Sequence, residues 1–94
     1  MFCVYILYSE KLNRFYIGTT DNAERRLAEH NNTAYTDSFT TRGIPWKMFL
    51  IIDNLHSKQA YDIERYLKRM KSSAYIKKLK TNPQIVEWII EKHK

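Results

Sequence analysis

The segment Phe2–Tyr8 limits the choice of fold more than any other part of the chain. It is almost wholly apolar and aromatic, and it contains the branched residues Val4 and Ile6. A short run of this composition predicts a strand that is buried on both of its faces. Arg14–Thr19 predicts a second strand, and the polar link 9–13 predicts a hairpin with a five-residue loop. A strand that is apolar on both sides needs helices on both faces of its sheet.

The middle of the chain predicts one helix, one irregular stretch and a third strand. Asp21 and Glu24 are spaced as in a capping box, at the start of a helix that ends near His30. The stretch Thr33–Trp46 is rich in threonine and carries helix breakers, so we expect it to be irregular. The apolar segment Lys47–Asp53 predicts the third strand.

The C-terminal part predicts three helices. Ser57 is expected to cap a helix that reaches about Lys71, and Ser72 and Ser73 interrupt it before a short helix over 74–79. Pro83 suits the first turn of a last helix. The predicted class is α+β, with a three-stranded antiparallel sheet flanked by helices in the order β-β-α-β-α-α, in which the short helix over 74–79 is not counted. The apolar stripes expected to face the core are Ala60, Ile63, Leu67 and Met70, and then Ile85, Trp88 and Ile89.

The composition is that of a single small globular domain spanning residues 1–94. Hydrophobic residues make up 44% of the chain, which is enough for one core, and 94 residues leave no room for two. No apolar run reaches the roughly 18 residues of a membrane span, and the N-terminus lacks the pattern of a signal peptide. The single cysteine, Cys3, excludes an internal disulfide and suits a reducing cytosol. We therefore expect a cytoplasmic protein with no membrane partner.

Two tyrosines, a glycine and an arginine come close together along the predicted hairpin and helix. Tyr5 and Tyr16 lie on different strands, Gly18 ends the second strand, and Arg26 lies in the helix that follows. Cleavage of a phosphodiester needs a base or its helper, a cation for the phosphate and close access to the backbone. His30 follows Arg26 by one helical turn and shares its face. The two tyrosines meet only if the hairpin register brings them together.

The same residues give the chain its resemblance to GIY-YIG nuclease domains, in particular to the small stand-alone class related to the N-terminal nuclease domain of excinuclease C. Cys3-Val4-Tyr5 stands where the family has Gly-Ile-Tyr, and Tyr16-Ile17-Gly18 matches the second triplet letter for letter. The resemblance implies the same sheet flanked by helices. Its further matches are Arg26 at the family's spacing from Tyr16, then His30, Glu64 in a later helix, and Asn82.

The resemblance also implies a metal-dependent nuclease site. In such a site Glu64 would hold Mg²⁺, with Mn²⁺ as the alternative, and Arg26 would bind the scissile phosphate. Tyr5 or Tyr16 would position or deprotonate the attacking water, with help from His30. A lone carboxylate suits Mg²⁺, which usually takes one or two protein ligands and keeps several waters. The candidate catalytic residues are therefore Tyr5, Tyr16, Arg26, His30 and Glu64, with Asn82 as a supporting residue.

Each of these residues also has a purely structural interpretation. The two tyrosines could be core aromatics, Gly18 a turn residue, and His30 a cation at the C-terminus of its helix. Glu64 could pair with Lys68 one helical turn later, and Asn82 could be an ordinary helix cap. The sequence alone does not choose between these interpretations and the catalytic ones.

Positive charge predicts a polyanionic partner. The formal net charge is +6, and the stretch from Arg65 to Lys80 holds seven basic residues and no acidic one. Arg25 and Arg26 are adjacent on a helix and cannot both face the site, which leaves Arg25 for solvent or DNA backbone. We expect DNA in preference to RNA, and the oligomeric state stays open. The predicted nucleic-acid-binding residues are Gly18, Arg25, Arg42, Lys68, Lys71, Lys77, Lys78 and Lys80.

These observations favour Mg²⁺-dependent hydrolysis of DNA phosphodiester bonds, in DNA repair or recombination. The alternative is a non-catalytic nucleic-acid-binding module of the same fold. A third interpretation is a protein-interaction domain with a basic surface. Metal-dependent nicking would separate the first from the second, and salt-sensitive DNA binding would separate both from the third.

Overall fold

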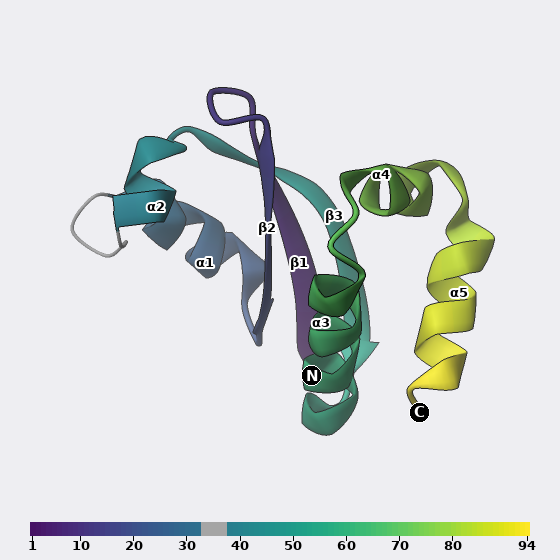
Figure 1. The fold of residues 1–94 in the computed structure, drawn as a ribbon. Coiled ribbons are helices and arrows are strands. Elements are labelled where there is room, and N and C mark those ends of the chain that lie inside the picture. The colour runs from purple at the N-terminus through teal and green to yellow at the C-terminus, as the bar shows by residue number, and fades with distance from the viewer. Residues whose placement is uncertain (33–37) are drawn as a thin grey trace.

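The computed structural model describes residues 1–32 and 38–94, and it contains a three-stranded antiparallel sheet with helices on both sides (Figure 1). Strand β1 lies in the centre of the sheet, between β2 and β3. The predicted α+β class and antiparallel sheet are confirmed. The elements are β1 (Phe2–Ser9), β2 (Arg14–Thr20), α1 (Ala23–His30), α2 (Ser38–Arg42), β3 (Trp46–Leu55), α3 (Ser57–Met70), α4 (Ser73–Thr81) and α5 (Pro83–Lys92).

The β1–β2 hairpin forms where the apolar pattern predicted it, with one difference in its loop. The register pairs Ser9 with Arg14, so the loop consists of residues 10–13 and is one residue shorter than expected. Ser9 belongs to the strand, and its buried hydroxyl donates a hydrogen bond of 2.7 Å to the carbonyl of Gly43. Asn13 closes the loop with φ of 52°, a left-handed conformation that asparagine tolerates better than most residues.

Alternate residues of β1 lie in two different cores, as expected of a strand that is apolar on both faces. Val4 and Ile6 belong to the core beneath α3, α4 and α5. Tyr5 belongs to the core on the α1 side, together with Leu7 and with Trp46 of β3. Figure 1 shows the sheet between these two helical layers. The prediction of helices on both faces is confirmed, and each functional side chain can be assigned to one face.

Two helices begin with a capping residue that differs from the predicted one by a single position. At the start of α1 the side chain of Asn22, and not that of Asp21, accepts the backbone N–H three residues later. Asp21 is paired instead with the guanidinium of Arg25. At the start of α3 the ring of His56 takes the capping role expected of Ser57. In both helices the capping residue is the one with extended backbone just before the first turn.

The stretch that was expected to be irregular contains helix α2 and the beginning of β3. The indole Nε1 of Trp46 donates a 2.7 Å hydrogen bond to the carbonyl of Thr40 at α2. The side chain of Asn31 accepts from the backbone N–H of Trp46 at 2.6 Å and donates to its carbonyl at 3.0 Å. These bonds satisfy buried polar groups and fasten α2 and the end of α1 to the edge of the sheet.

The predicted apolar stripes of the C-terminal helices are confirmed in part. Met70 is exposed because it is the last residue of α3, immediately before the left-handed residue Lys71. Trp88 is also exposed, and Nζ of Lys92 lies 4.7 Å from the centre of one of its rings. Among the residues that the structure describes, no helix combines the length and apolar character needed to cross a bilayer. The stripe residues that are fully buried are Ala60, Ile63, Leu67 and Ile89.

Candidate active site

Tyr5 and Tyr16 lie on the same face of the hairpin, the face that is covered by α1. The register pairs Tyr5 with Gly18 and Tyr16 with Leu7, so the two tyrosines are diagonal neighbours. Their ring centroids are 6.3 Å apart in a stacked arrangement. Tyr5 is only 1% exposed, whereas Tyr16 is half-buried. Tyr16 is therefore the tyrosine of the pair that has access to solvent.

Helix α1 places His30 and Arg26 beside these rings. The hydroxyl of Tyr5 lies 3.1 Å from Nε2 of His30, and Nη2 of Arg26 lies 3.5 Å from the same nitrogen. A guanidinium can only donate hydrogen bonds, so we infer that Nε2 is an acceptor and that the Tyr5 hydroxyl donates to it. The ring centroids of His30 and Tyr16 are 4.4 Å apart, and His30 is 4% exposed. We call these four residues the tyrosine–arginine cluster: Tyr5, Tyr16, Arg26 and His30.

The two adjacent arginines of α1 have different surroundings. The side chain of Arg26 is 33% exposed, forms an ion pair with Glu29 and contacts His30. The side chain of Arg25 is 53% exposed and pairs with Asp21 at 3.1 Å and with Glu29 at 3.8 Å. The structure thus places the guanidinium of Arg26, and not that of Arg25, next to the tyrosines. Of these two arginines, Arg26 is the one in position to present a cation to a group bound there.

The pKa of Tyr5 is raised above its usual value, chiefly because burial disfavours the charged phenolate. The hydrogen bond and charge of Arg26 act in the opposite direction, while the charges of Tyr16 and Glu64 add to the rise. The pKa of Arg26 is also raised, first of all by its hydrogen bond with Tyr5. Tyr5 is therefore a neutral phenol at neutral pH, and Arg26 keeps its positive charge.

The structure gives a packing reason for glycine at position 18, while its predicted contact with nucleic acid stays a prediction. Gly18 was predicted to give nucleic acid close access, but the ring of Tyr5 fills the space above it. A Cβ added at Gly18 would lie 2.5 Å from Cζ and 2.8 Å from Cε1 of Tyr5. The absence of a side chain at Gly18 therefore lets the Tyr5 ring lie flat across β2 and reach His30 and Arg26.

We expect Gly18→Ala to lower the free energy of unfolding by about 1–3 kcal/mol, because the new methyl group overlaps a buried ring. Chemical denaturation followed by circular dichroism measures this change. Adding the same substitution to Tyr5→Ala should cost far less, because the ring that it would strike is then absent. Equal costs in the two backgrounds would contradict the proposed contact.

Glu64 approaches the same region from the opposite face of the sheet. Its carboxylate accepts a hydrogen bond from the hydroxyl of Thr19, the residue next to Gly18 on the edge strand β2. The second carboxylate oxygen accepts a 2.7 Å hydrogen bond from Nζ of Lys68. The side chain of Glu64 is 19% exposed, and its charge contributes to the raised pKa of Tyr5. The carboxylate and the tyrosine–arginine cluster are therefore electrostatically linked across β2.

The surroundings of Glu64 fit a cation with few protein ligands. Within residues 1–32 and 38–94, no three side chains of His, Cys, Asp or Glu gather closely enough to hold a metal ion. That excludes a cage of protein ligands among these residues, but Mg²⁺ does not need one. Lys68 now neutralises the carboxylate, and its long exposed side chain can turn away at small cost. Glu64 is thus the residue that would hold Mg²⁺, with water and substrate oxygens as the other ligands.

The remaining predicted residues lie in several places. Lys68 and Lys71 line a groove beside β2, and Lys77 and Lys80 line a neighbouring hollow. Lys78 lines neither of them, and Arg42 ends α2 on the α1 side of the sheet (Figure 1).

Asn82 is exposed at the junction of α4 and α5. Its side-chain nitrogen lies 3.4 Å from the carbonyl of Lys78 and 3.2 Å from the hydroxyl of Thr81. It stands at the N-cap position of α5 but makes no capping hydrogen bond there. These contacts connect Asn82 to α4, and the hydrogen bonds that it makes do not join it to the tyrosine–arginine cluster.

Thr19 is the site residue that the sequence interpretation missed. It follows the second triplet directly, and strand alternation turns it away from the tyrosines, toward α3. The signal that could have found it is its place between Gly18 and Thr20 on a predicted strand. A residue next to one that faces α1 must face the opposite layer, where the helix that carries Glu64 lies.

Fold and site together define a small α+β domain whose tyrosines, arginine and carboxylate meet at an edge strand. The chain belongs to the GIY-YIG catalytic domain family, whose sequence model matches residues 1–83. The match spans the hairpin, α1 and α3, and so it includes every member of the tyrosine–arginine cluster and Glu64. Helix α5 lies almost entirely beyond it.

Curated relatives are fungal proteins named structure-specific endonuclease subunit SLX1. The protein of Meyerozyma guilliermondii is 41% identical over 78 residues, which cover 78% of this chain and 26% of that protein. The protein of Vanderwaltozyma polyspora is 39% identical over 64 residues, covering 63% of this chain and 20% of that protein. The chain therefore spans about a quarter or less of the length of these relatives.

Proposed function

We propose that this chain is a metal-dependent endonuclease that hydrolyses DNA phosphodiester bonds. The observation that carries the proposal is the convergence of a partly buried cluster that contains an arginine and of a carboxylate at one edge of the sheet. Arg26 contacts His30 and Tyr5 on one face of β2, and Glu64 reaches Thr19 on the other. Membership in the GIY-YIG catalytic domain family supports the proposal, as do the names of the relatives.

In this proposal Arg26 binds the scissile phosphate. Its guanidinium can donate to two phosphate oxygens at once and can stabilise the negative charge that grows on them in the transition state. The hydrogen bonds and contacts of Arg26 with Tyr5, His30 and Glu29 hold it in one place before substrate binds. Such preorganisation means that little reorganisation is needed when the charge develops.

The two tyrosines take different parts. Tyr5 is buried, neutral and hydrogen-bonded to His30, so it positions His30 and Arg26. Tyr16 is half-buried and packs against the His30 ring, so its hydroxyl is the one available to orient the attacking water. It could take the proton of that water only as the phenolate, a form that a neighbouring cation favours. We therefore assign the water to Tyr16 and the support of the arginine to Tyr5.

Glu64 would hold a divalent cation, with Mg²⁺ as the first choice and Mn²⁺ as the alternative. When bound there, such an ion supplies positive charge to the phosphate and lowers the pKa of bound water. The part of the protein is to present the carboxylate. Thr19 orients one of its oxygens, and Lys68, which now pairs with the other, would have to leave it for an ion to bind.

A second candidate function is a nucleic-acid-binding module without catalysis. The observation that favours it is that both oxygens of Glu64 already have partners in Thr19 and Lys68. If Lys68 stayed in place, the domain would present a neutralised site and a basic surface. Roles in DNA repair or recombination, and a cytoplasmic location, are part of the first proposal.

The decisive experiment incubates the purified protein with labelled single-stranded, duplex, flapped and branched DNA, with Mg²⁺ and with EDTA in excess. We expect cleavage of at least one substrate with Mg²⁺, and none with EDTA, because the chain alone supplies too little positive charge beside the phosphate. Binding without cleavage under both conditions would favour the non-catalytic module. Cleavage that EDTA leaves unchanged would contradict the metal-dependent mechanism.

A further inference from the structure

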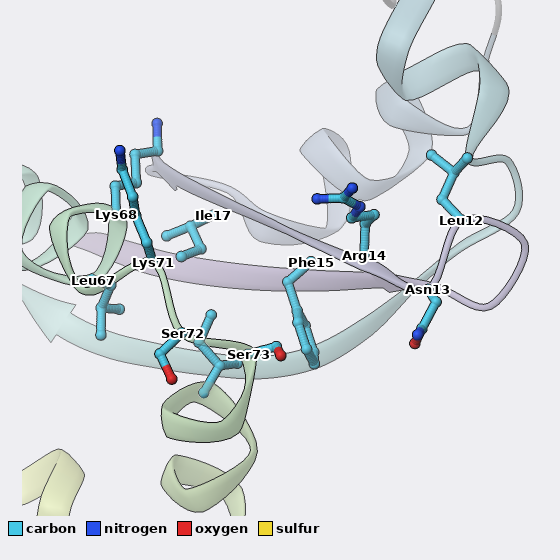
Figure 2. A pocket seen from close by; sticks show the side chains of 11 residues that line it. Leu12, Asn13, Arg14, Phe15, Ile17, Leu67, Lys68, Lys71, Ser72 and Ser73 are labelled. Carbon is cyan, nitrogen blue, oxygen red and sulfur yellow. The ribbon is translucent and has the colours of Figure 1, made fainter.

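A basic groove runs along the face of β2 that is turned away from Tyr5. It has a volume of about 730 Å³ and lies between β2, the end of α3 and the start of α4. Figure 2 shows Lys68 and Lys71 on the α3 side of this groove and Arg14 and Phe15 on the β2 side. Among the described residues that line it, none is acidic. We call it the β2–α3 groove.

A second hollow, of about 330 Å³, continues from the first. Phe15 lines both of them, so its ring stands between the two. The second hollow adds Lys77 and Lys80, together with Phe49, and again none of the described residues that line it is acidic. Nζ of Lys80 lies 4.7 Å from the centre of the Phe49 ring and covers that face, and Tyr8 lines the second hollow as well. The Phe15 ring packs against both, with centroids 5.0 Å from Tyr8 and 4.9 Å from Phe49, and Phe15 is the aromatic residue that lines both hollows.

The β2–α3 groove begins at the candidate metal ligand. Lys68 lines the groove, and its Nζ lies 2.7 Å from Oε2 of Glu64. A nucleic acid strand whose phosphate is bound between Arg26 and Glu64 would therefore meet the groove on leaving that site. No acidic residue is among the described residues that line the two hollows, and of their lysines Lys68 is the one that pairs with a carboxylate, that of Glu64. Cations in such a row match a chain of phosphates, and each neutralised phosphate releases counterions.

The aromatic ring decides which kind of strand fits. Every base has a flat face that can stack on a ring, but in a duplex these faces are covered by the neighbouring base pairs. A half-buried ring between two rows of lysines thus suits a strand whose bases are unpaired. A duplex could touch the lysines from outside, but it could not bring a base face onto Phe15.

We propose that the β2–α3 groove binds an unpaired DNA strand that continues from the cleaved phosphate, with one base stacked on Phe15. The inference rests on the proposed nuclease function and names its substrate class, which is DNA with an unpaired segment next to the cut. Lys71, Lys77 and Lys80 bind the backbone of this segment, while Tyr16 and Arg26 act on the phosphate. The groove thereby holds the substrate without taking part in the chemistry.

The test measures equilibrium binding in EDTA, where no cleavage occurs, by fluorescence anisotropy of a labelled oligothymidine and of a duplex of the same length. Phe15→Leu keeps an apolar side chain in the core and removes the flat ring. We expect it to weaken binding of the single strand at least about fivefold, which is the lower limit for loss of one base stack. Binding of the duplex should stay as in the wild type. Equal binding of the single strand by both proteins would overturn the proposal.

A substitution that removes one positive charge from the groove tests strand binding independently of Phe15. Lys71→Gln should make the slope of log affinity against log salt shallower by about 0.7 on the single strand, because one phosphate contact is lost. The matched control is Lys58→Gln, which removes the same charge from the exposed first turn of the same helix, outside both hollows. Its slope should equal that of the wild type. Equal changes of the slope in both variants would mean that the overall charge of the protein causes them. That result would overturn the proposed binding of DNA in the groove.

Binding in EDTA and cleavage with Mg²⁺ test the groove and the proposed nuclease function separately. Circular dichroism first establishes that each variant is folded, and the comparison of Lys71→Gln with Lys58→Gln decides alone should Phe15→Leu fail to fold. A protein that binds as expected in EDTA but cuts no substrate with Mg²⁺ would retain the groove and lose the nuclease. A protein that cuts but shows no effect of Phe15→Leu or Lys71→Gln would retain the nuclease and lose the groove.

Discussion

Glu64→Gln is expected to abolish Mg²⁺-dependent cleavage while the protein stays folded. The substitution conserves size and keeps an oxygen that can accept from Thr19, but it removes the anionic ligand that a hard cation needs. Cleavage of the substrate found in the panel, measured against added Mg²⁺, gives the loss of activity. Thermal unfolding of the variant should remain close to that of the wild type, because the ion pair with Lys68 is near the surface.

A matched control for this substitution is Glu10→Gln. Glu10 also forms an ion pair, with Lys47 at 3.0 Å, but it lies in the hairpin loop and its side chain is exposed. This variant loses the same charge and should cleave as the wild type does. Near-normal activity of Glu64→Gln would exclude Glu64 as the metal ligand, and equal losses in the two variants would point to a general effect of charge.

Arg26→Ala should lower the rate of cleavage by about 10²-fold or more, because the transition state loses a preorganised cation. Arg25→Ala is the control on the neighbouring position, since it also removes an arginine that pairs with Glu29. Its effect should appear mainly as weaker binding of DNA. Single-turnover kinetics with saturating enzyme separate the two effects. Equal losses of rate would mean that the assignment of helix faces is wrong.

Much of the fold could be predicted because local patterns determine it. The apolar run of β1 required cover on both sides, and this single fact predicted two layers of helices. The spacing of Arg26 and His30 placed both side chains on one face of α1, and both do contact the tyrosines. Such predictions succeed because they depend only on the period of one element.

The caps were harder to predict because neighbouring polar residues compete for the same role. Asp21 and Asn22 are both good caps, and sequence spacing does not say which backbone is extended. At α3 the preferred capping residue, Ser57, lies inside the helix, and His56, which is not a common cap, has the extended backbone. Asp21 does not cap α1, and its carboxylate forms an ion pair with Arg25 instead. These errors moved the start of a helix by one residue and left the fold unchanged.

The role of Gly18 and the existence of the groove could not be read from the sequence, because both depend on contacts between distant segments. The ring that covers Gly18 belongs to β1, and the groove joins Phe15 to lysines more than fifty residues later. A basic stretch along the chain does not show which of its members share a surface. Lys78, which stands between Lys77 and Lys80 in the sequence, lines neither hollow, whereas those two lysines line the second one.

The two halves of the site depend on successive residues of β2, and this limits how the chain can change in evolution. Gly18 makes room for Tyr5 on one face, and Thr19 orients Glu64 on the other. Insertion or deletion of one residue within β2 would turn both positions to the wrong face at once. The loop 10–13 lies outside this requirement and can vary in length. Descendants of this chain should therefore gain and lose residues in the loop, while β2 keeps its length.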